Sequence, residues 1–134
     1  MSNAMPNTIS NKVAIVILSD PKASTDEALG RVFNALAVSY DYDQAGSDVR
    51  VQFQGAGTRW PEMLSNPAHP ANSLWESVRH TVAGVSCGCA DLFGASTSAQ
   101  AAGMALVREN PVPGTTGIAG MRALIADGYH VITF

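Results

Sequence analysis

The sequence is poor in charge, contains only two cysteines, and has neither a basic run nor a long apolar run. Charged residues make up 14% of the 134 residues, against about a quarter in typical soluble proteins, and the net charge is −3. Non-specific nucleic-acid binding needs a basic face, which this balance does not supply. No stretch is apolar for long enough to cross a bilayer, so no membrane partner is expected. So few charges leave little polar surface, which favours a homo-oligomer.

The chain also lacks a secretory signal, because residues 1–11 are polar and contain no apolar core segment. We therefore expect a cytoplasmic protein whose cysteines are thiols rather than a structural disulfide. Ser2, Asn3 and Ala4 precede a second methionine, Met5, as in a cloning remnant. Residues 1–11 are predicted to be a disordered N-terminus, and residues 12–134 a single domain. One Cys-x-Cys pair falls short of a zinc site, and no metal or cofactor is predicted.

What the chain does contain is an alternation of strand and helix patterns. Residues 13–18 form an unbroken apolar run, which is typical of a strand covered on both faces. Ser24 and Glu27 have capping-box spacing, which predicts a helix start, and Thr116 is expected to cap the last helix. Residues 49–53 instead alternate between apolar and polar, which predicts an edge strand or a strand that faces a partner subunit.

This alternation indicates a parallel sheet with helices on both faces. If the first strand is central and the second lies at an edge, the order 2-1-3-4-5 of flavodoxin-like folds follows. The predicted fold class is therefore α/β, a flavodoxin-like three-layer α/β/α sandwich with a five-stranded, mostly parallel sheet.

The candidate site is residues 85–94, which hold both cysteines, Cys87 and Cys89, at the end of the predicted third strand. In α/β sheets, binding sites form at the carboxyl ends of strands. A sulfur nucleophile must be a thiolate, and a helix start near Asp91 would favour that form. The alternative is that both cysteines are small buried apolar residues, which is common for free cysteine. Both interpretations stay open at this point.

Further residues are predicted to line the same pocket: Ser19, Asp20, Gly55, Gly57, Trp60 and Ser86. Four of them have a plainer alternative. Asp20 before Pro21 is also a turn starter. The glycine pair Gly55 and Gly57 lacks the third glycine of a dinucleotide loop, which favours a turn. For Trp60, core or subunit packing is the favoured alternative.

Four segments of the chain carry a further signal: residues 12–21 (KVAIVILSDP), 53–60 (FQGAGTRW), 83–95 (AGVSCGCADLFGA) and 124–134 (LIADGYHVITF). In this order they resemble the DsrE/DsrF-like family of small sulfur-relay proteins. The resemblance implies a flavodoxin-like sandwich that assembles into trimers or hexamers. It also implies that a cysteine after the third strand carries sulfur as a persulfide, received from a donor protein and passed to an acceptor.

Relatives in that family often have a Cys-x-x-Cys pair at this point. Here Ser86 occupies the first position, Cys89 matches the second, and Cys87 is displaced by one. The resemblance therefore assigns the sulfur-carrying role to Cys89, with Cys87 as a local resolving partner. The activity is at most that of a persulfide carrier or transferase. The alternative functions are a non-catalytic oligomeric binding or assembly protein and a small-ligand binder on the same scaffold.

Overall fold

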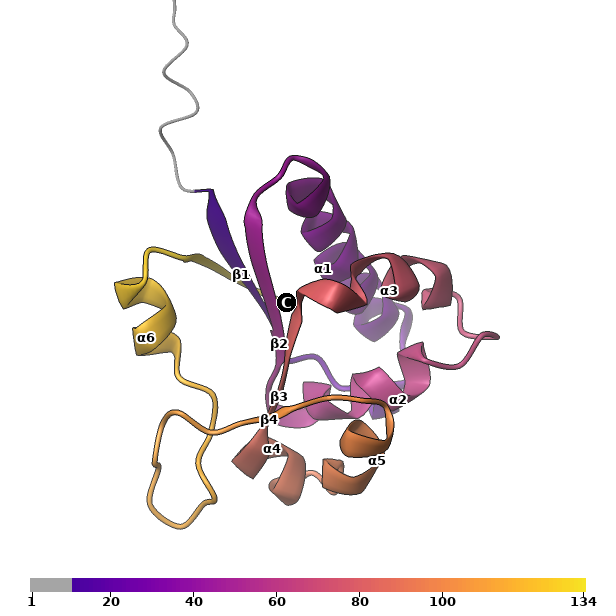
Figure 1. Ribbon diagram of the computed structural model, residues 1–134. Helices are drawn as coiled ribbons and strands as arrows, with labels where there is room; N and C mark the ends of the chain where they lie inside the picture. The colour runs from indigo at the N-terminus through magenta and orange to yellow at the C-terminus, as the bar shows by residue number, and fades with distance from the viewer. Residues whose placement is uncertain (1–10) are drawn as a thin grey trace, which may run out of the picture.

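Five parallel strands form one sheet in the computed structural model, which describes residues 11–134 (Figure 1). The strands are β1 (Lys12–Ile17), β2 (Asp48–Phe53), β3 (Val82–Ser86), β4 (Leu106–Val107) and β5 (His130–Thr133). They lie in the order β4-β3-β2-β1-β5, and every neighbouring pair is parallel. Apart from Asn11, the N-terminus predicted to be disordered lies outside the described residues.

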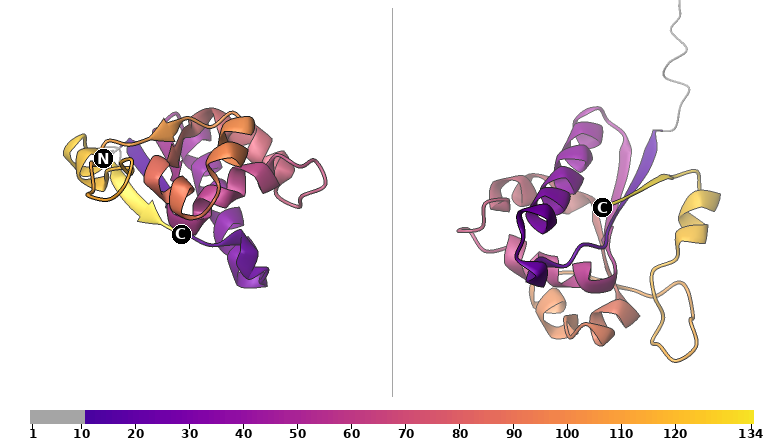
Figure 2. Two further views of the ribbon diagram at one scale, coloured as in Figure 1. Left: turned by 90° about the horizontal axis from the view of Figure 1, so that it is seen from below. Right: turned by 180° about the vertical axis from the view of Figure 1, so that it is seen from behind.

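Helices cover both faces of this sheet and its carboxyl edge (Figures 1 and 2). One face carries α1 (Asp26–Gln44), α2 (Trp60–Leu64) and α3 (Asn72–Val78), and the other carries α6 (Met121–Ala126). The short helices α4 (Cys87–Leu92) and α5 (Ser96–Ala101) lie beyond the carboxyl ends of β3 and β4. Three 3-10 turns complete the fold, namely η2 (Pro21–Ala23), η3 (Gly55–Arg59) and η4 (Arg79–Thr81). The prediction of an α/β fold with a parallel sheet flanked by helices is confirmed.

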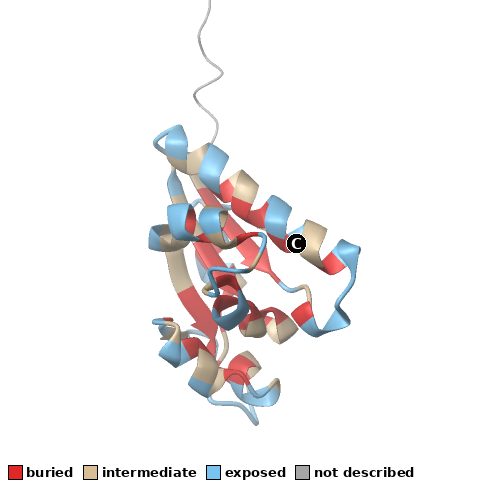
Figure 3. Ribbon diagram, turned by 90° about the vertical axis from the view of Figure 1, so that its right-hand side faces the viewer, coloured by how far each residue is buried: buried red, intermediate tan, exposed pale blue. Residues whose placement is uncertain are grey.

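The main core lies between the sheet and α1, where buried residues of both elements face one another (Figure 3). The apolar run of β1 explains this arrangement. Ile15 and Ile17 face the core cluster, while Ala14 and Val16 are equally buried on the opposite face. Helix α1 begins one residue later than its predicted capping box, because Thr25 accepts the Ala28 N–H (3.1 Å). Among the helices of residues 11–134, none has the length and apolar composition needed to cross a bilayer.

The strand order differs from the predicted 2-1-3-4-5, because β2 lies in the middle of the sheet rather than at an edge. Of the polar residues that suggested an edge, Gln52 and Gln54 are buried and paired with one another, and Arg50 is partly exposed. Gln52 is fully buried, and its Nε2 donates to Gln54 Oε1 (2.9 Å). Arg50 contacts Gln52 Oε1 (3.4 Å) and forms an ion pair with Glu109 (3.5 Å). A polar face on a central strand is tolerated when its hydrogen bonds are satisfied in this way.

The last helix also begins later than predicted, at Met121 instead of after Thr116. The preceding residues form a loop in which Asn110 and Ile118 make an antiparallel bridge. Gly117 has a φ of +100°, and a Cβ there would lie 2.8 Å from the carbonyl oxygen of Arg108. A helix through this position would break both arrangements, so residues 116–120 remain non-helical and pass beside the start of α4.

Candidate functional site

Both cysteines lie in the first turn of α4, directly after the third strand rather than at its end. Strand β3 ends at Ser86 and the helix begins at Cys87, four residues before the expected start at Asp91. Ser86 occupies the N-cap position but makes no capping bond within α4. Its hydroxyl oxygen accepts the backbone N–H of Ala119 instead (3.0 Å). A tertiary contact therefore replaces the local capping signal that would have marked the helix start.

The two thiols have different environments, although both are free. Cys87 is buried, and its Sγ lies 3.2 Å from Thr116 Oγ1. Cys89 is partly exposed and lines a pocket that Cys87 does not line. The sequence left open whether the cysteines are reactive thiols or small buried apolar residues. Cys87 fits the buried alternative and Cys89 fits the accessible one.

Residues 115–119 are fixed against the cysteine turn by backbone contacts. The Gly88 N–H donates to the Gly117 carbonyl (2.7 Å), beside the bond between Ser86 and Ala119. A Cβ on Gly88 would lie 3.0 Å from Ile118 Cγ2 and 3.1 Å from the Gly117 oxygen. Glycine at this position therefore allows a loop from the end of the chain to pack directly on the start of α4.

Asp91 organises the polar side of this contact. Its carboxylate accepts hydrogen bonds from Ser96 Oγ (2.6 Å) and Thr116 Oγ1 (2.7 Å). The bond from Ser96, then that from Thr116, lowers the pKa of Asp91, and the charge of Arg108 adds to the same effect. A carboxylate only accepts, so the Thr116 proton points to Asp91. The Thr116 oxygen then remains free to accept from the S–H of Cys87.

The pocket beside Cys89 has a volume of about 470 Å³, within the size range of small-molecule sites. Helix α4 forms one wall and the loop before α6 forms the other. The lining residues are Gly88, Cys89, Asp91, Leu92, Gly114, Thr115, Thr116 and Ile118. Sequence reasoning missed this second wall, because Thr116 was interpreted as a helix cap.

The other predicted pocket residues are not gathered around Cys89. Ser19 and Asp20 line a separate pocket of about 390 Å³ at the ends of β1 and β5. Trp60 lines a third, of about 240 Å³. Gly55 and Gly57 form the turn η3 and line none of these three pockets. The structure thus distributes the predicted set along the carboxyl edge of the sheet.

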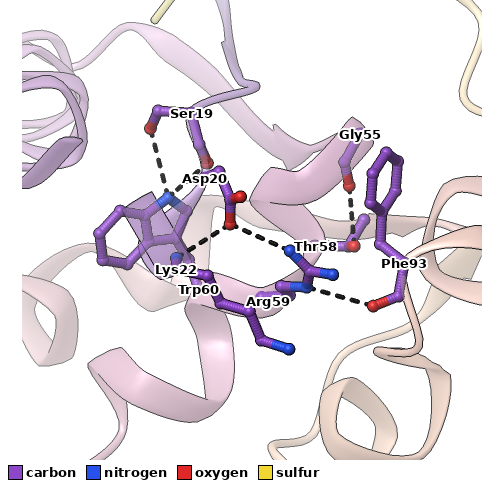
Figure 4. A network of polar contacts seen from close by, with 8 residues as sticks. All are labelled: Ser19, Asp20, Lys22, Gly55, Thr58, Arg59, Trp60 and Phe93. Atoms are coloured by element: carbon purple, nitrogen blue, oxygen red, sulfur yellow. Dashed lines mark hydrogen bonds and ion pairs between the residues drawn. The ribbon is translucent and has the colours of Figure 1, made fainter. Parts of the chain in front are cut away.

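A polar network nevertheless connects this edge to the cysteine helix (Figure 4). Trp60 Nε1 donates to the carbonyl of Ser19 (2.9 Å). Arg59 forms an ion pair with Asp20 (3.1 Å), and its Nε donates to the carbonyl of Phe93 at the end of α4 (3.1 Å). The sequence analysis did not identify Arg59 as a site residue. The one signal available was its position next to Trp60, which was predicted to line the pocket. It positions α4 rather than contacting the pocket.

The histidines are not arranged as ligands. His69 Nδ1 accepts the Ala71 N–H (3.1 Å), and its ring packs edge-on against Trp60. Partial burial lowers the pKa of His69, which favours the neutral ring. Within residues 11–134, no group of three or more His, Cys, Asp or Glu side chains is placed to hold a metal ion.

Replacing Ser86 by alanine is expected to loosen the contact between the cysteine turn and the loop. The Ala119 N–H would lose its buried acceptor, which costs about 1–3 kcal/mol of the free energy of unfolding. Native-state alkylation of Cys87 should become faster, because Thr116 lies on the same loop. Urea titration and mass mapping of alkylated cysteines measure both effects.

The matched control is S77A, because the Ser77 hydroxyl is exposed and bonds only within its own helix. A loss of stability in S86A no larger than in S77A would contradict the proposed contact.

Comparison of the chain with protein-family models, with curated proteins and with solved structures gives no match. The resemblance of four segments to sulfur-relay proteins is therefore carried by those residues alone. The fold and the geometry of the cysteine turn are the remaining guides to function.

Proposed function

We propose that this chain is a cytoplasmic, oligomeric sulfur carrier of the DsrE/DsrF-like type, with Cys89 as the acceptor. The observation that carries the proposal is the difference between the two thiols. Cys89 lines a pocket of about 470 Å³, while Cys87 is buried against Thr116. The position supports the same proposal, since the carboxyl edge of a parallel sheet is where such folds bind ligands.

The proposed reaction moves one sulfur atom without net oxidation or reduction. The Cys89 thiolate attacks the outer sulfur of a donor persulfide, R–S–SH. The S–S bond of the donor breaks, R–S⁻ leaves, and a new S–S bond gives Cys89–S–SH. An acceptor thiolate then attacks the outer sulfur of Cys89–S–SH and regenerates the Cys89 thiolate. A resolving role for Cys87 stays a prediction, and it requires Cys87 to leave its contact with Thr116.

Incubation of the folded protein with a persulfide donor is expected to add one sulfur atom, measured by intact mass. The adduct should be lost in C89S and retained in C87S, which is the matched control because serine can keep the hydrogen bond to Thr116. An acceptor thiol should then remove the added sulfur. Absence of the adduct in the wild-type protein, or its survival in C89S, would overturn the assignment.

The second candidate is a non-catalytic assembly or binding protein on the same scaffold. Several large apolar side chains are exposed, and these would suit contacts between copies: Leu18, Phe33, Tyr40, Met63, Leu92 and Ile125. Slow alkylation of Cys89 in the native state would favour this candidate over the carrier. Both candidates predict a trimer or hexamer, which light scattering measures. A thermal-shift screen against small ligands tests the remaining alternative, a small-ligand binder.

A further inference from the structure

The pocket beside Cys89 carries a single fixed charge. Of the described side chains that line it, only Asp91 is charged, and the lining includes no Lys, Arg or His. Arg108 acts on Asp91 electrostatically but is not part of the lining. The walls are otherwise formed by glycines, the thiol of Cys89, two threonines, Leu92 and Ile118. A ligand that enters therefore meets one carboxylate in the same pocket as the Cys89 sulfur.

The two lining hydroxyls do not offset this charge, because each donates its proton within the protein. Thr115 Oγ1 donates to the Val112 carbonyl (2.7 Å) and also accepts the Gly117 N–H (3.0 Å). Thr116 Oγ1 donates to Asp91 (2.7 Å). The carboxylate is held in place by Thr116 on one oxygen and by Ser96 on the other. These bonds lower the pKa of Asp91, so the negative charge persists at neutral pH.

We propose that this pocket selects its sulfur donor by charge, and that the donor is a short aliphatic persulfide carrying a positively charged amine. The proposal rests on the proposed function and names its substrate class. The volume of about 470 Å³ suits a small molecule, and Leu92 and Ile118 suit a short carbon chain. Thiosulfate and carboxylate-bearing persulfides are disfavoured, because their anionic groups would be repelled by the Asp91 carboxylate in the same pocket.

The size of the effect follows from the exposure of Asp91. Opposite charges a few ångströms apart attract only weakly in water, enough to change a rate by about fivefold. Because Asp91 is exposed to solvent, salt screens this attraction. A preference of about threefold to tenfold for a cationic reagent over an anionic one is therefore expected at low salt, and it should approach one at high salt.

The test uses three symmetrical disulfides of similar size as probes: cystamine (cationic), 2-hydroxyethyl disulfide (neutral) and 3,3′-dithiodipropionate (anionic). In each case the Cys89 thiolate attacks one sulfur, a mixed disulfide forms on Cys89, and the other half leaves as a thiolate. Rates at Cys89 are measured by peptide mass mapping of the whole chain. Each rate is divided by the rate for N-acetylcysteine amide, an uncharged thiol, which removes the intrinsic reactivity of the probe.

After this division, cystamine is expected to react fastest and dithiodipropionate slowest in the wild-type protein. The D91N variant should bring the ratio of these two rates towards one, because the amide removes the charge. Its Oδ1 can accept from one of the two hydroxyls and its Nδ2 can donate to the other. The control is D41N, which removes the same charge from the far end of α1. The Asp41 carboxylate makes no side-chain bond within residues 11–134.

An equal ratio in the wild-type protein and D91N, or a ratio that salt does not change, would overturn the charge selection. The salt series needs no variant, so it decides the question even if D91N does not fold. If the charge order appears but no persulfide adduct forms on Cys89, the carrier function fails while the charge-selective pocket stands. If the adduct forms without a charge order, the carrier function stands and this inference fails.

Discussion

Replacing Trp75 by alanine is expected to lower the free energy of unfolding by about 3–5 kcal/mol. Trp75 is fully buried in α3, and its ring packs edge-on against Phe53 of β2, with ring centroids 5.9 Å apart. The guanidinium of Arg79 lies over the indole ring, 5.6 Å from the centroid. Truncation would open a cavity between the central strand and its covering helix. Urea unfolding followed by circular dichroism measures the loss.

The variant W75F separates packing from hydrogen bonding at the same position. Trp75 Nε1 is buried and has no hydrogen-bond partner within residues 11–134. Phenylalanine keeps an aromatic ring against Phe53 and removes an unsatisfied N–H, whose burial is itself unfavourable. We therefore expect W75F to lose less than half as much stability as W75A. Equal losses in the two variants would show that the indole N–H is satisfied in the folded protein.

Replacing Gly57 by alanine is expected to destabilise the fold by about 3 kcal/mol or more, through a backbone clash. A Cβ at this position would lie 2.3 Å from the carbonyl oxygen of Ile17 and 3.0 Å from its carbon. Neither atom is part of a flexible side chain, so the end of β1 would have to move. Gly57 therefore serves the close approach of η3 to β1, which explains the glycine without a bound ligand.

The matched control is G55A, in the same turn. Gly55 has a φ of +57°, and a Cβ there would contact only Leu18 Cδ2, at 3.7 Å. The expected cost is the left-handed conformation alone, about 1 kcal/mol. Urea titration of both variants measures the difference, with the Cys89 alkylation rate as a check on the site. Similar losses in G55A and G57A would contradict the close approach as the reason for Gly57.

The carboxyl edge of the sheet supports the cysteine helix by bonds that are distant from the pocket. Arg59 connects Asp20, after β1, to the carbonyl of Phe93, at the end of α4. Loop residues 115–119 fix the other end of α4 through Ser86 and Gly88. The helix that carries Cys89 is therefore held at both ends by segments from other parts of the chain. This arrangement gives Cys89 a defined position although α4 is only six residues long.

The sequence by itself determined the elements of the sheet and their direction. The apolar run of β1 is buried on both faces, and the alternation of strands with helices produced a parallel sheet. These features depend on local patterns, because the period of apolar residues fixes which side chains a strand or helix can bury.

Only the tertiary structure decided which strands are neighbours and which residues share a pocket. Gln52 and Gln54 resemble solvent-facing residues in the sequence, yet they satisfy each other inside a central strand. Thr116 lies 25 residues after Asp91, and their hydrogen bond joins the two walls of the pocket beside Cys89. A local sequence pattern predicts whether a residue is buried. The hydrogen-bond partner of that residue depends on how distant segments of the chain pack together.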